Sequence, residues 1–273
     1  MNTAELYSDA SFKPIAERVL RRGLDLHQYK ASFVGRRLEV RLRARGVDNY
    51  QKYAAILDED PSEYAVLFDA LSINVTEFFR DEAVFDAFSR FIVPEMLARS
   101  NEVDLRIWSA GCASGEEAYT IAIALTEALK RLGSAATFTV LGTDVSKRAI
   151  EVAKLAKYPF SSLRKLPERV VSEYFRPSPE EGYYEVGRKV RDSMRFSSGD
   201  LVLATRPTNV DVIFCRNVLI YMGREVQAKL FTRFYRALNA SGYLVLGMTE
   251  TIIGAPAGVF EARMQRERIF QKR

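Results

Sequence analysis

A short apolar stretch leads into a turn of small residues and then into two acids, and this segment is where the sequence most clearly indicates chemistry. Residues 105–110 are typical of a buried strand, and residues 111–115 (GCASG) are typical of a tight turn. Glu116 and Glu117 open a helix whose apolar residues recur at three- and four-residue spacing up to residue 132. A strand, a small-residue turn and a helix N-terminus together form a common binding place for nucleotide cofactors.

The two acids restrict which cofactor can bind at this turn. A turn that holds pyrophosphate offers its backbone N–H groups to the phosphate oxygens, and carboxylates beside them would repel that ligand and compete for the same donors. The expected ligand is therefore uncharged or cationic at this point. Among the common nucleoside cofactors, S-adenosylmethionine meets this condition, because it has no phosphate and carries a sulfonium and an ammonium group.

Each acid also has a structural explanation. Ser114 and Glu117 fit the capping box Ser-x-x-Glu, in which two side chains take up free N–H groups at a helix start, so we assign Glu117 to that role. Glu116 has no such duty and is predicted to meet the cationic end of the cofactor. Its alternative is an acid that the helix dipole favours in the first turn.

Two further predicted strands end in polar residues. Residues 138–143 precede Asp144, and the apolar residues 211–215 precede Arg216 and Asn217. Ligands of open α/β sheets lie beyond the carboxyl ends of the strands, so we expect these side chains beside the small-residue turn. An acid at the end of the second strand commonly binds ribose hydroxyls, which is the role predicted for Asp144, with a cap or turn residue as the alternative.

The elements that must position these residues alternate between strand and helix after residue 100, and this alternation predicts a parallel sheet covered by helices. Strands are expected at 105–110, 138–143, 211–215 and 243–247, helices at 116–132, 147–156 and 224–238, a cap at Ser146, and a closing apolar pair around Phe260 and Ile269. Residues 158–201 interrupt the pattern with a short helix near 163–175 and a hairpin over 183–191. We expect an inserted β element there.

The earlier part of the chain, from about residue 8 to residue 99, has helical periodicity, with Gly23 and Gly46 as stops and Pro61 before a helix at 63–71. The predicted domains are therefore a helical one with a linker helix over 1–99 and an α/β one over 100–273, with the inserted β-subdomain at about 176–195.

The composition is that of an ordinary folded protein, with 273 residues, 48% hydrophobic and 27% charged. The first residues do not resemble a signal peptide and no apolar run reaches spanning length, so we expect a cytoplasmic protein. Cys112 and Cys215 stand alone in the sequence, which indicates neither a disulfide framework nor a metal site. Both are expected to be small buried side chains.

Positive charge is concentrated between residues 18 and 45, with nine Lys and Arg against two acids. Apolar residues recur there at helical spacing, at Val34, Leu38 and Leu42. Arg36 and Arg43 then fall on the opposite face of the helix. This face is either a docking surface for an acidic partner or a merely solvated surface. Nucleic acid is disfavoured, because no aromatic residues interleave with the arginines to stack on bases.

Four segments together resemble the chemotaxis receptor methyltransferases, the CheR family, over nearly the full length of the chain. They read INVTEFFR (73–80), WSAGCASGEE (108–117), GTD (142–144) and CRNVLIY (215–221). The resemblance implies a class I S-adenosylmethionine-dependent methyltransferase with a Rossmann-like α/β sheet, an N-terminal helical domain and an inserted small antiparallel β-subdomain. The reaction implied gives glutamate γ-methyl esters on receptor signalling helices and S-adenosylhomocysteine as the second product.

By resemblance, the cofactor contacts fall on Asn74, Thr76, Arg80, Glu116, Asp144, Asp200, Leu201, Arg216 and Asn217. Arg80 and Tyr221 look like the residues that flank the transferred methyl group, and they are the predicted catalytic residues. Arg80 would orient a carboxylate, with a salt bridge near Asp81 as its alternative, and Tyr221 is otherwise a core aromatic. Asp200 stands where the family often has Asn, which puts its contact with adenine in doubt.

The proposed nucleophile needs no general base, because a glutamate with a pKa near 4.3 is already an anion at neutral pH. His27, the one histidine, is accordingly predicted to be a surface or packing residue. By resemblance, acidic receptor helices would dock on the basic face, and a receptor tail could pair with the inserted hairpin. The competing hypotheses are an RNA methyltransferase, suggested by the pI near 9.1, and a non-catalytic adaptor that binds the cofactor.

Overall fold

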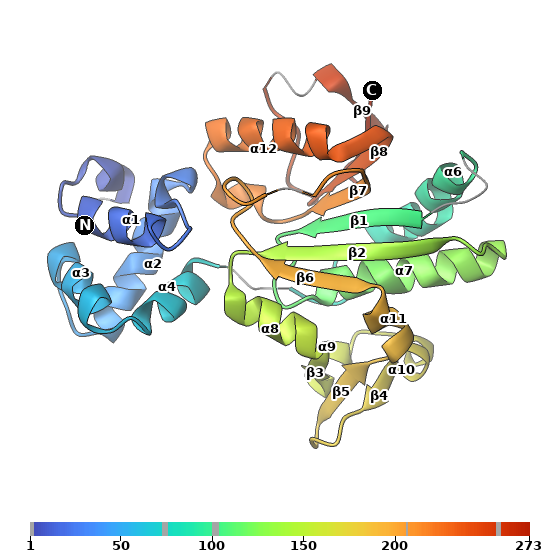
Figure 1. Cartoon of the computed structure of the whole chain (residues 1–273), viewed down its shortest axis with the longest axis horizontal. Coiled ribbons are helices and arrows are strands. Elements are labelled where there is room, and N and C mark those ends of the chain that lie inside the picture. The colour runs from blue at the N-terminus through green and yellow to red at the C-terminus, as the bar shows by residue number, and fades with distance from the viewer. Residues whose placement is uncertain (1–2, 73–75, 100–103, 206, 255–257) are drawn as a thin grey trace.

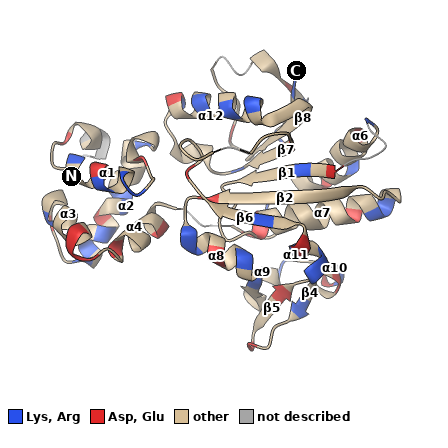
Figure 2. Cartoon of the chain, in the orientation of Figure 1, with Lys and Arg blue, Asp and Glu red and all other residues tan. Residues whose placement is uncertain are grey.

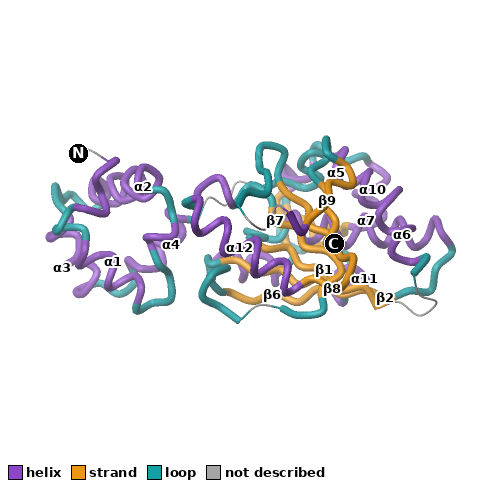
Figure 3. Tube along the Cα trace, turned by 90° about the horizontal axis from the view of Figure 1, so that it is seen from above, coloured by secondary structure: helices purple, strands orange, loops and turns teal. Residues whose placement is uncertain are grey.

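A lobe of helices at the N-terminal end stands beside a larger α/β lobe in the computed structural model (Figure 1). The structure describes residues 3–72, 76–99, 104–205, 207–254 and 258–273. Seen from above, the chain passes from the helical lobe into the α/β lobe after α4, and the strands lie together in the larger lobe (Figure 3). In the described part of the chain, no helix is both long and apolar enough to cross a membrane.

The helical lobe has a hydrophobic core of its own. Its elements are η1 (Thr3–Ser8), α1 (Lys13–Leu20), η2 (Leu26–Gln28), α2 (Ala31–Ala44), α3 (Tyr50–Glu59) and α4 (Glu63–Leu71). The predicted apolar stripe of α2 is buried in this core. One buried acid, Glu63, is held there by Arg41 at 2.8 Å and by the hydroxyl of Tyr53 at 2.7 Å.

The helices that follow pack on the sheet instead of the helical lobe. These are α5 (Glu82–Ala87), the π-helical turn η3 (Phe88–Ile92) and α6 (Val93–Leu97). Their buried side chains, Val84 and Phe88 among them, share one core with the first strand and the helix after it. By packing, residues 82–97 therefore go with the α/β lobe, while the predicted domain boundary at residue 99 stays a prediction.

Within the described ranges, the main sheet has the strand order β6-β2-β1-β7-β8-β10-β9. The strands are β1 (Asp104–Ala110), β2 (Thr137–Asp144), β6 (Met194–Ser198), β7 (Val210–Cys215), β8 (Leu238–Leu246), β9 (Phe260–Met264) and β10 (Ile269–Lys272). Strands β6, β2, β1, β7 and β8 run parallel, and β10 pairs antiparallel with both β8 and β9. The predicted parallel sheet and the closing pair are confirmed.

The two faces of this sheet are covered by different helices, because alternate side chains of a strand point to opposite faces. Leu105 and Ile107 of β1 pack in one core with α7 (Glu116–Leu132), whereas Trp108 and Ala110 pack in another core with α12 (Arg224–Ala237). Helix α8 (Lys147–Leu155) begins at the predicted cap, where the Ser146 hydroxyl accepts the Ala149 N–H at 3.0 Å. Every predicted helix of the alternation is present.

The predicted inserted antiparallel β-subdomain is confirmed, but its strands differ from the predicted ones. A second sheet has the order β3-β5-β4, from β3 (Lys157–Pro159), β4 (Phe175–Pro177) and β5 (Tyr183–Val186), with α9 (Phe160–Leu163) and α10 (Glu168–Tyr174) between them. The predicted hairpin over 183–191 is wrong. After β5 the chain forms α11 (Arg188–Asp192), which begins after the extended residue Gly187 and buries Val190 in the core that α7 occupies.

Three smaller predictions are confirmed. Cys112 and Cys215 are buried thiols, and burial raises the pKa of both. His27 is an exposed packing residue, with Nδ1 at 3.2 Å from Asp25 Oδ1 and its ring 4.9 Å from that of Tyr7.

Candidate active site

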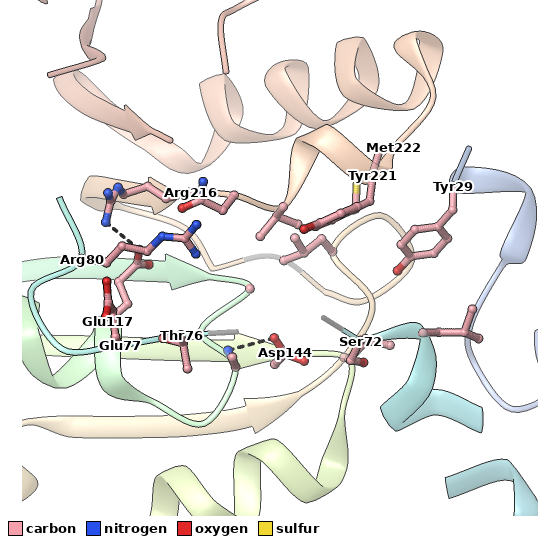
Figure 4. Close-up of a pocket in the computed structure, with 18 of the residues that line it drawn as sticks. Tyr29, Ser72, Thr76, Glu77, Arg80, Glu117, Asp144, Arg216, Tyr221 and Met222 are labelled. Atoms are coloured by element: carbon pink, nitrogen blue, oxygen red, sulfur yellow. Dashed lines mark hydrogen bonds and ion pairs between the residues drawn. The ribbon is translucent and has the colours of Figure 1, made fainter. Parts of the chain in front are cut away.

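A cavity lies at the carboxyl ends of β1, β2 and β7, where the sheet meets the helical lobe (Figure 4). It encloses about 890 Å³ of space, its open mouth included. Seven of the predicted site residues line it, namely Thr76, Arg80, Asp144, Leu201, Arg216, Asn217 and Tyr221. Residues from three strand ends and from the segment before α5 are therefore brought together.

Three predicted residues are not among those seven. Glu116 is buried but is not part of the cavity lining, and neither is Asp200, although its neighbours Gly199 and Leu201 are. Asn74 lies outside the described residues.

The turn after β1 is fixed by its fit to two neighbouring loops. Gly111 has a φ of +86°, and a Cβ on it would stand 2.4 Å from Cγ2 of Val218. The N–H groups of Gly111 and Cys112 both donate to the Thr143 carbonyl, at 2.8 and 3.0 Å. The turn is thereby tied to the end of β2, and only a residue without a side chain fits at its start.

The predicted capping box is not formed, because the residue before α7 is Gly115 in a left-handed conformation and no side chain caps the helix. The Ser114 hydroxyl donates to Glu116 Oε2 at 2.7 Å instead. Glu117 accepts a hydrogen bond from the hydroxyl of Ser109 at 2.8 Å and lines the cavity. Of the two acids, Glu117 and not Glu116 is among the residues that line the cavity, and the predicted contact of Glu116 with the cofactor stays a prediction.

Arg216 is buried at the centre of an ionic cluster, with its side chain 1% exposed. Its guanidinium lies 2.5 Å from Asp81, 3.4 Å from Glu117 and 5.3 Å from the centre of the Phe85 ring. Burial raises the pKa of Glu117, while Arg216 and the Ser109 hydroxyl oppose that rise. Asp81, which the sequence offered as a salt-bridge partner for Arg80, forms a salt bridge with Arg216.

Asp144 serves as a turn residue and also lines the cavity. Its Oδ2 accepts the Ala113 N–H at 2.9 Å (Figure 4), and its Oδ1 accepts the Ser146 N–H, also at 2.9 Å. Burial raises the pKa of this carboxyl group, and the backbone hydrogen bonds oppose the rise. Because a carboxylate oxygen has two lone pairs, each oxygen can accept a further hydrogen bond from a ligand in the cavity.

Asp200 organises a loop. Its Oδ1 accepts the N–H groups of Val202 at 2.7 Å and Leu203 at 3.0 Å, and burial raises its pKa. This arrangement places Gly199 and Leu201 on the cavity wall. The predicted role of Asp200 in a direct adenine contact stays a prediction.

Tyr221 connects the strand end to the helical lobe. It closes the 3₁₀ turn η4 (Leu219–Tyr221), its ring lies 5.0 Å from that of Phe33 on α2, and its carbonyl accepts the Lys30 N–H at 2.9 Å. Figure 4 shows Tyr221, Arg80 and Asp144 around the same cavity, with Tyr29 coming from the helical lobe.

Sequence reasoning missed Tyr29 and Val218 as cavity residues and assigned Glu117 to another role. A signal for Glu117 was available, because side chains on a helix point back towards its N-terminus and towards the strand end. No sequence signal was available for Tyr29, since it reaches the cavity only through the contact between the two lobes.

The central strands are parallel, the turn after β1 carries a carboxylate, and a second carboxylate stands at the end of β2. The described residues contain no phosphate-binding loop. Together these features are those of the class I S-adenosylmethionine-dependent methyltransferases. Comparison with known families agrees. The chain matches the SAM-binding domain of CheR methyltransferases over residues 74–268 and their all-alpha domain over residues 11–72. The chain therefore belongs to the CheR methyltransferase family, and its cofactor is S-adenosylmethionine.

Individual relatives cover most of the chain. A chemotaxis protein methyltransferase of Salmonella typhimurium is 32% identical, over 89% of this chain and 84% of that one. Chemotaxis protein methyltransferase 2 of Pseudomonas aeruginosa is 31% identical, over 91% and 89%. An uncharacterized 104.1 kDa protein of Rhodobacter capsulatus is 32% identical over 89% of this chain, which spans 25% of that protein. Among solved structures, a putative methyltransferase of Methanococcus maripaludis aligns over 68% of this chain and 63% of that one, at 16% identity and a TM-score of 0.34.

Proposed function

We propose that this methyltransferase acts on glutamate side chains of the cytoplasmic signalling helices of chemotaxis receptors and produces γ-methyl esters. One cavity is lined both by carboxylates suited to a cationic cofactor and by Arg80, whose guanidinium is suited to a carboxylate substrate. This observation carries the proposal. A guanidinium binds a carboxylate in fixed planar geometry, so Arg80 can orient the incoming glutamate or the carboxylate of the cofactor.

The residues present fit the cofactor. Glu117 lies where it can meet the methionyl ammonium, and Asp144 has lone pairs for ribose hydroxyls. Arg216 offers little net charge to an anion, since Asp81 and Glu117 pair with it. When bound, S-adenosylmethionine supplies an electrophilic methyl group. The contribution of the chain is then to orient the carboxylate and exclude water, and deprotonation is not required.

Glu117→Gln is expected to weaken S-adenosylhomocysteine binding by about 10-fold, and Glu116→Gln by less than about threefold, because only Glu117 faces the cavity. A nearby ammonium favours the ionised form of Glu117, whose pKa burial raises in the free protein, so binding should lower that pKa again. Affinity should therefore increase as pH rises above the ordinary carboxyl pKa of 4.5 and level off beyond the raised one.

Calorimetry of both variants between about pH 5.5 and pH 8 measures this difference. Glu116→Gln is the matched control, since it keeps the neighbouring helix start and should keep the slope with pH. Equal affinities, or a slope that survives in Glu117→Gln, would assign the ammonium to another group.

Tyr221→Phe is expected to lower kcat about 10-fold and to leave S-adenosylhomocysteine affinity unchanged, because the ring still packs against Phe33 while the hydroxyl beside the reacting groups is lost. Single-turnover methylation and calorimetry give the two numbers. An unchanged rate would make Tyr221 a packing residue.

We infer that the acidic receptor helices dock on α2. Several arginines of the basic segment are paired within the lobe, as Arg18 is with Asp58 at 2.6 Å and Arg45 with Asp60 at 3.0 Å. Ribbon segments of basic and of acidic residues accordingly both occur over the helical lobe in Figure 2. Arg36 and Arg43 are exposed on the face of α2 opposite its buried stripe, which leaves them able to meet a partner.

Arg36→Glu combined with Arg43→Glu is expected to raise the KM for a receptor cytoplasmic fragment about 10-fold at low salt, because charge complementarity mainly speeds encounter. Cofactor affinity should not change. The control is Arg266→Glu, an exposed arginine near the C-terminus. If that substitution raises KM equally, net charge and not the α2 face governs docking.

A receptor tail is the second contact that we propose, by strand addition to the inserted sheet. Its outer strands are β3 and β4, and each contains a proline, Pro159 or Pro177, which cannot donate a backbone hydrogen bond. The available edge is therefore short. Calorimetry with a tail peptide would measure the contribution of this edge to binding.

The activity itself is tested with methyl-labelled S-adenosylmethionine, offered a receptor cytoplasmic fragment or RNA. We expect label on the receptor fragment that is released by mild base, as a carboxyl methyl ester must be, and a place of action in the cytoplasm, where the signalling helices lie. Base-stable label on RNA would support an RNA methyltransferase, and cofactor binding without transfer to either would support an adaptor.

A further inference from the structure

A buried acid that the reaction scheme does not use follows β8. Glu250 is 4% exposed and stands four residues beyond the end of this strand. Since β7 and β8 are parallel neighbours, the loops after their carboxyl ends lie side by side. The loop after β7 carries Arg216, Asn217 and Tyr221 to the cavity.

Within the described residues, the Glu250 carboxylate accepts four backbone N–H groups. Oε1 accepts those of Leu219 at 2.8 Å and Ile220 at 3.3 Å, and Oε2 accepts those of Asn217 at 2.9 Å and Gly247 at 2.8 Å. Hydrogen bonds to an ionised acceptor are about twice as strong as neutral ones. Three of these donors belong to the loop after β7, which therefore folds around this single side chain.

The loop needs such an acceptor because its tight turn takes backbone N–H groups away from water. Asn217 has a φ of +60°, in the left-handed region that asparagine enters more readily than most residues other than glycine. The N–H groups in this tight turn point inward, where, unpaired, each would lose its hydration without compensation. Glu250 replaces the water that these groups would otherwise bind.

The surrounding backbone leaves the loop no room to shift. A Cβ on Gly247 would lie 2.7 Å from Glu250 Oε2 and 2.8 Å from the nitrogen of Asn217. On the other side, Val218 fills the space that a side chain on Gly111 would need. The loop after β8, the loop after β7 and the turn after β1 are thus interlocked, and the side chain of Glu250 lies between the first two.

We propose that Glu250 is a positioning residue for methyl transfer, which sets the place of Asn217, Val218 and Tyr221 in the cavity by holding the backbone of their loop. It does not line the cavity and touches no reacting atom. The inference rests on the proposed methyl transfer only for its turnover measurement, because cofactor binding and hydrogen exchange report on it without any receptor.

The test compares two buried glutamates. Glu250→Gln keeps the shape but turns an N–H₂ group towards N–H donors, so at least one pair of hydrogen bonds is lost. Glu63→Gln is the matched control, since Glu63 is 2% exposed and accepts three hydrogen bonds, from Arg41 and Tyr53, but lies in the core of the helical lobe. Four measurements are made on both variants: thermal unfolding, S-adenosylhomocysteine calorimetry, hydrogen exchange of the peptide 216–222, and receptor methylation. The methylation rate is divided by the concentration of binding-competent protein that calorimetry gives.

Glu250→Gln is expected to weaken S-adenosylhomocysteine binding about 10-fold, to lower normalised kcat about 10- to 100-fold and to increase exchange in 216–222, because a small displacement of positioned groups has effects of this size. Glu63→Gln should lower the melting temperature while affinity, exchange in 216–222 and normalised kcat stay within about twofold. If Glu250→Gln does not fold, Glu250→Asp, whose shorter carboxylate cannot reach all four donors, takes its place.

The proposal is overturned if the folded Glu250 variant matches Glu63→Gln in affinity, exchange and normalised kcat, since its role is then stability alone. If the wild-type protein methylates no receptor, the proposed function fails, but the loss of affinity and of protection in 216–222 still decides the role of Glu250.

Discussion

Asp144→Asn is expected to weaken S-adenosylhomocysteine binding by about 100-fold, the largest effect on affinity among these predictions. The carboxylate of Asp144 accepts backbone N–H groups from Ala113 and Ser146 on separate oxygens. An amide can present an oxygen to only one of them and turns its N–H₂ group towards the other. The turn after β1 would then lose its tie to the end of β2, and a ribose would lose a charged acceptor.

Calorimetry measures the affinity, and Asp69→Asn is the matched control. Asp69 accepts the hydroxyl of the same Ser146 at 2.9 Å but does not line the cavity. Its variant should bind S-adenosylhomocysteine within about twofold of the wild-type protein. Comparable losses in both variants would mean that the start of α8, and not the carboxylate in the cavity, governs binding.

Arg216→Met is expected to lower the free energy of unfolding by about 3–5 kcal/mol at neutral pH, because breaking a buried ion pair leaves an uncompensated charge. The side chain of Arg216 is 1% exposed, and that of Glu117 is 14% exposed. Without the guanidinium, the pKa of Glu117 rises further above its ordinary value of 4.5, since Arg216 opposes the effect of burial. The destabilisation should therefore grow as pH rises from 4.5 towards the raised pKa of Glu117 in the variant.

Urea unfolding at two pH values measures the effect, and Arg216→Met combined with Glu117→Gln tests its cause. A neutral Gln needs no counter-ion, so the double variant should recover part of the stability that the single one loses. A loss that is the same at pH 5 and pH 8, and is not relieved by Glu117→Gln, would point to lost packing against Phe85 instead.

The local elements could be predicted because their signals are local. Helical spacing located α7 and α12, the buried apolar runs located β1, β2 and β7, and Ser146 indicated the start of α8. The resemblance added the site residues before α5 and after β7. The inserted antiparallel sheet was predicted, but its strand pairing was not, because β3 and β5 pair across more than twenty residues and no local pattern records which short strands meet.

The roles of the two acids in the turn after β1 show the same division. The sequence established that two carboxylates begin α7 directly after the turn, and carboxylates at this place excluded a pyrophosphate site. Which of the two acids lines the cavity depends on the direction of the helix relative to β7. Arg216, which follows β7, pairs with Glu117, whereas Glu116 accepts a hydrogen bond from Ser114.

By itself, the sequence determined the class of cofactor, the alternation of strands and helices, and the strand ends where polar residues gather, since charge and periodicity are properties of neighbouring residues. Only the tertiary structure decided that Glu117 lines the cavity, that Tyr29 reaches it from the other lobe, and that Glu250 bonds the loop after β7. Those outcomes depend on contacts between segments far apart in the chain, whose geometry is fixed only when the lobes and the strand-end loops pack together.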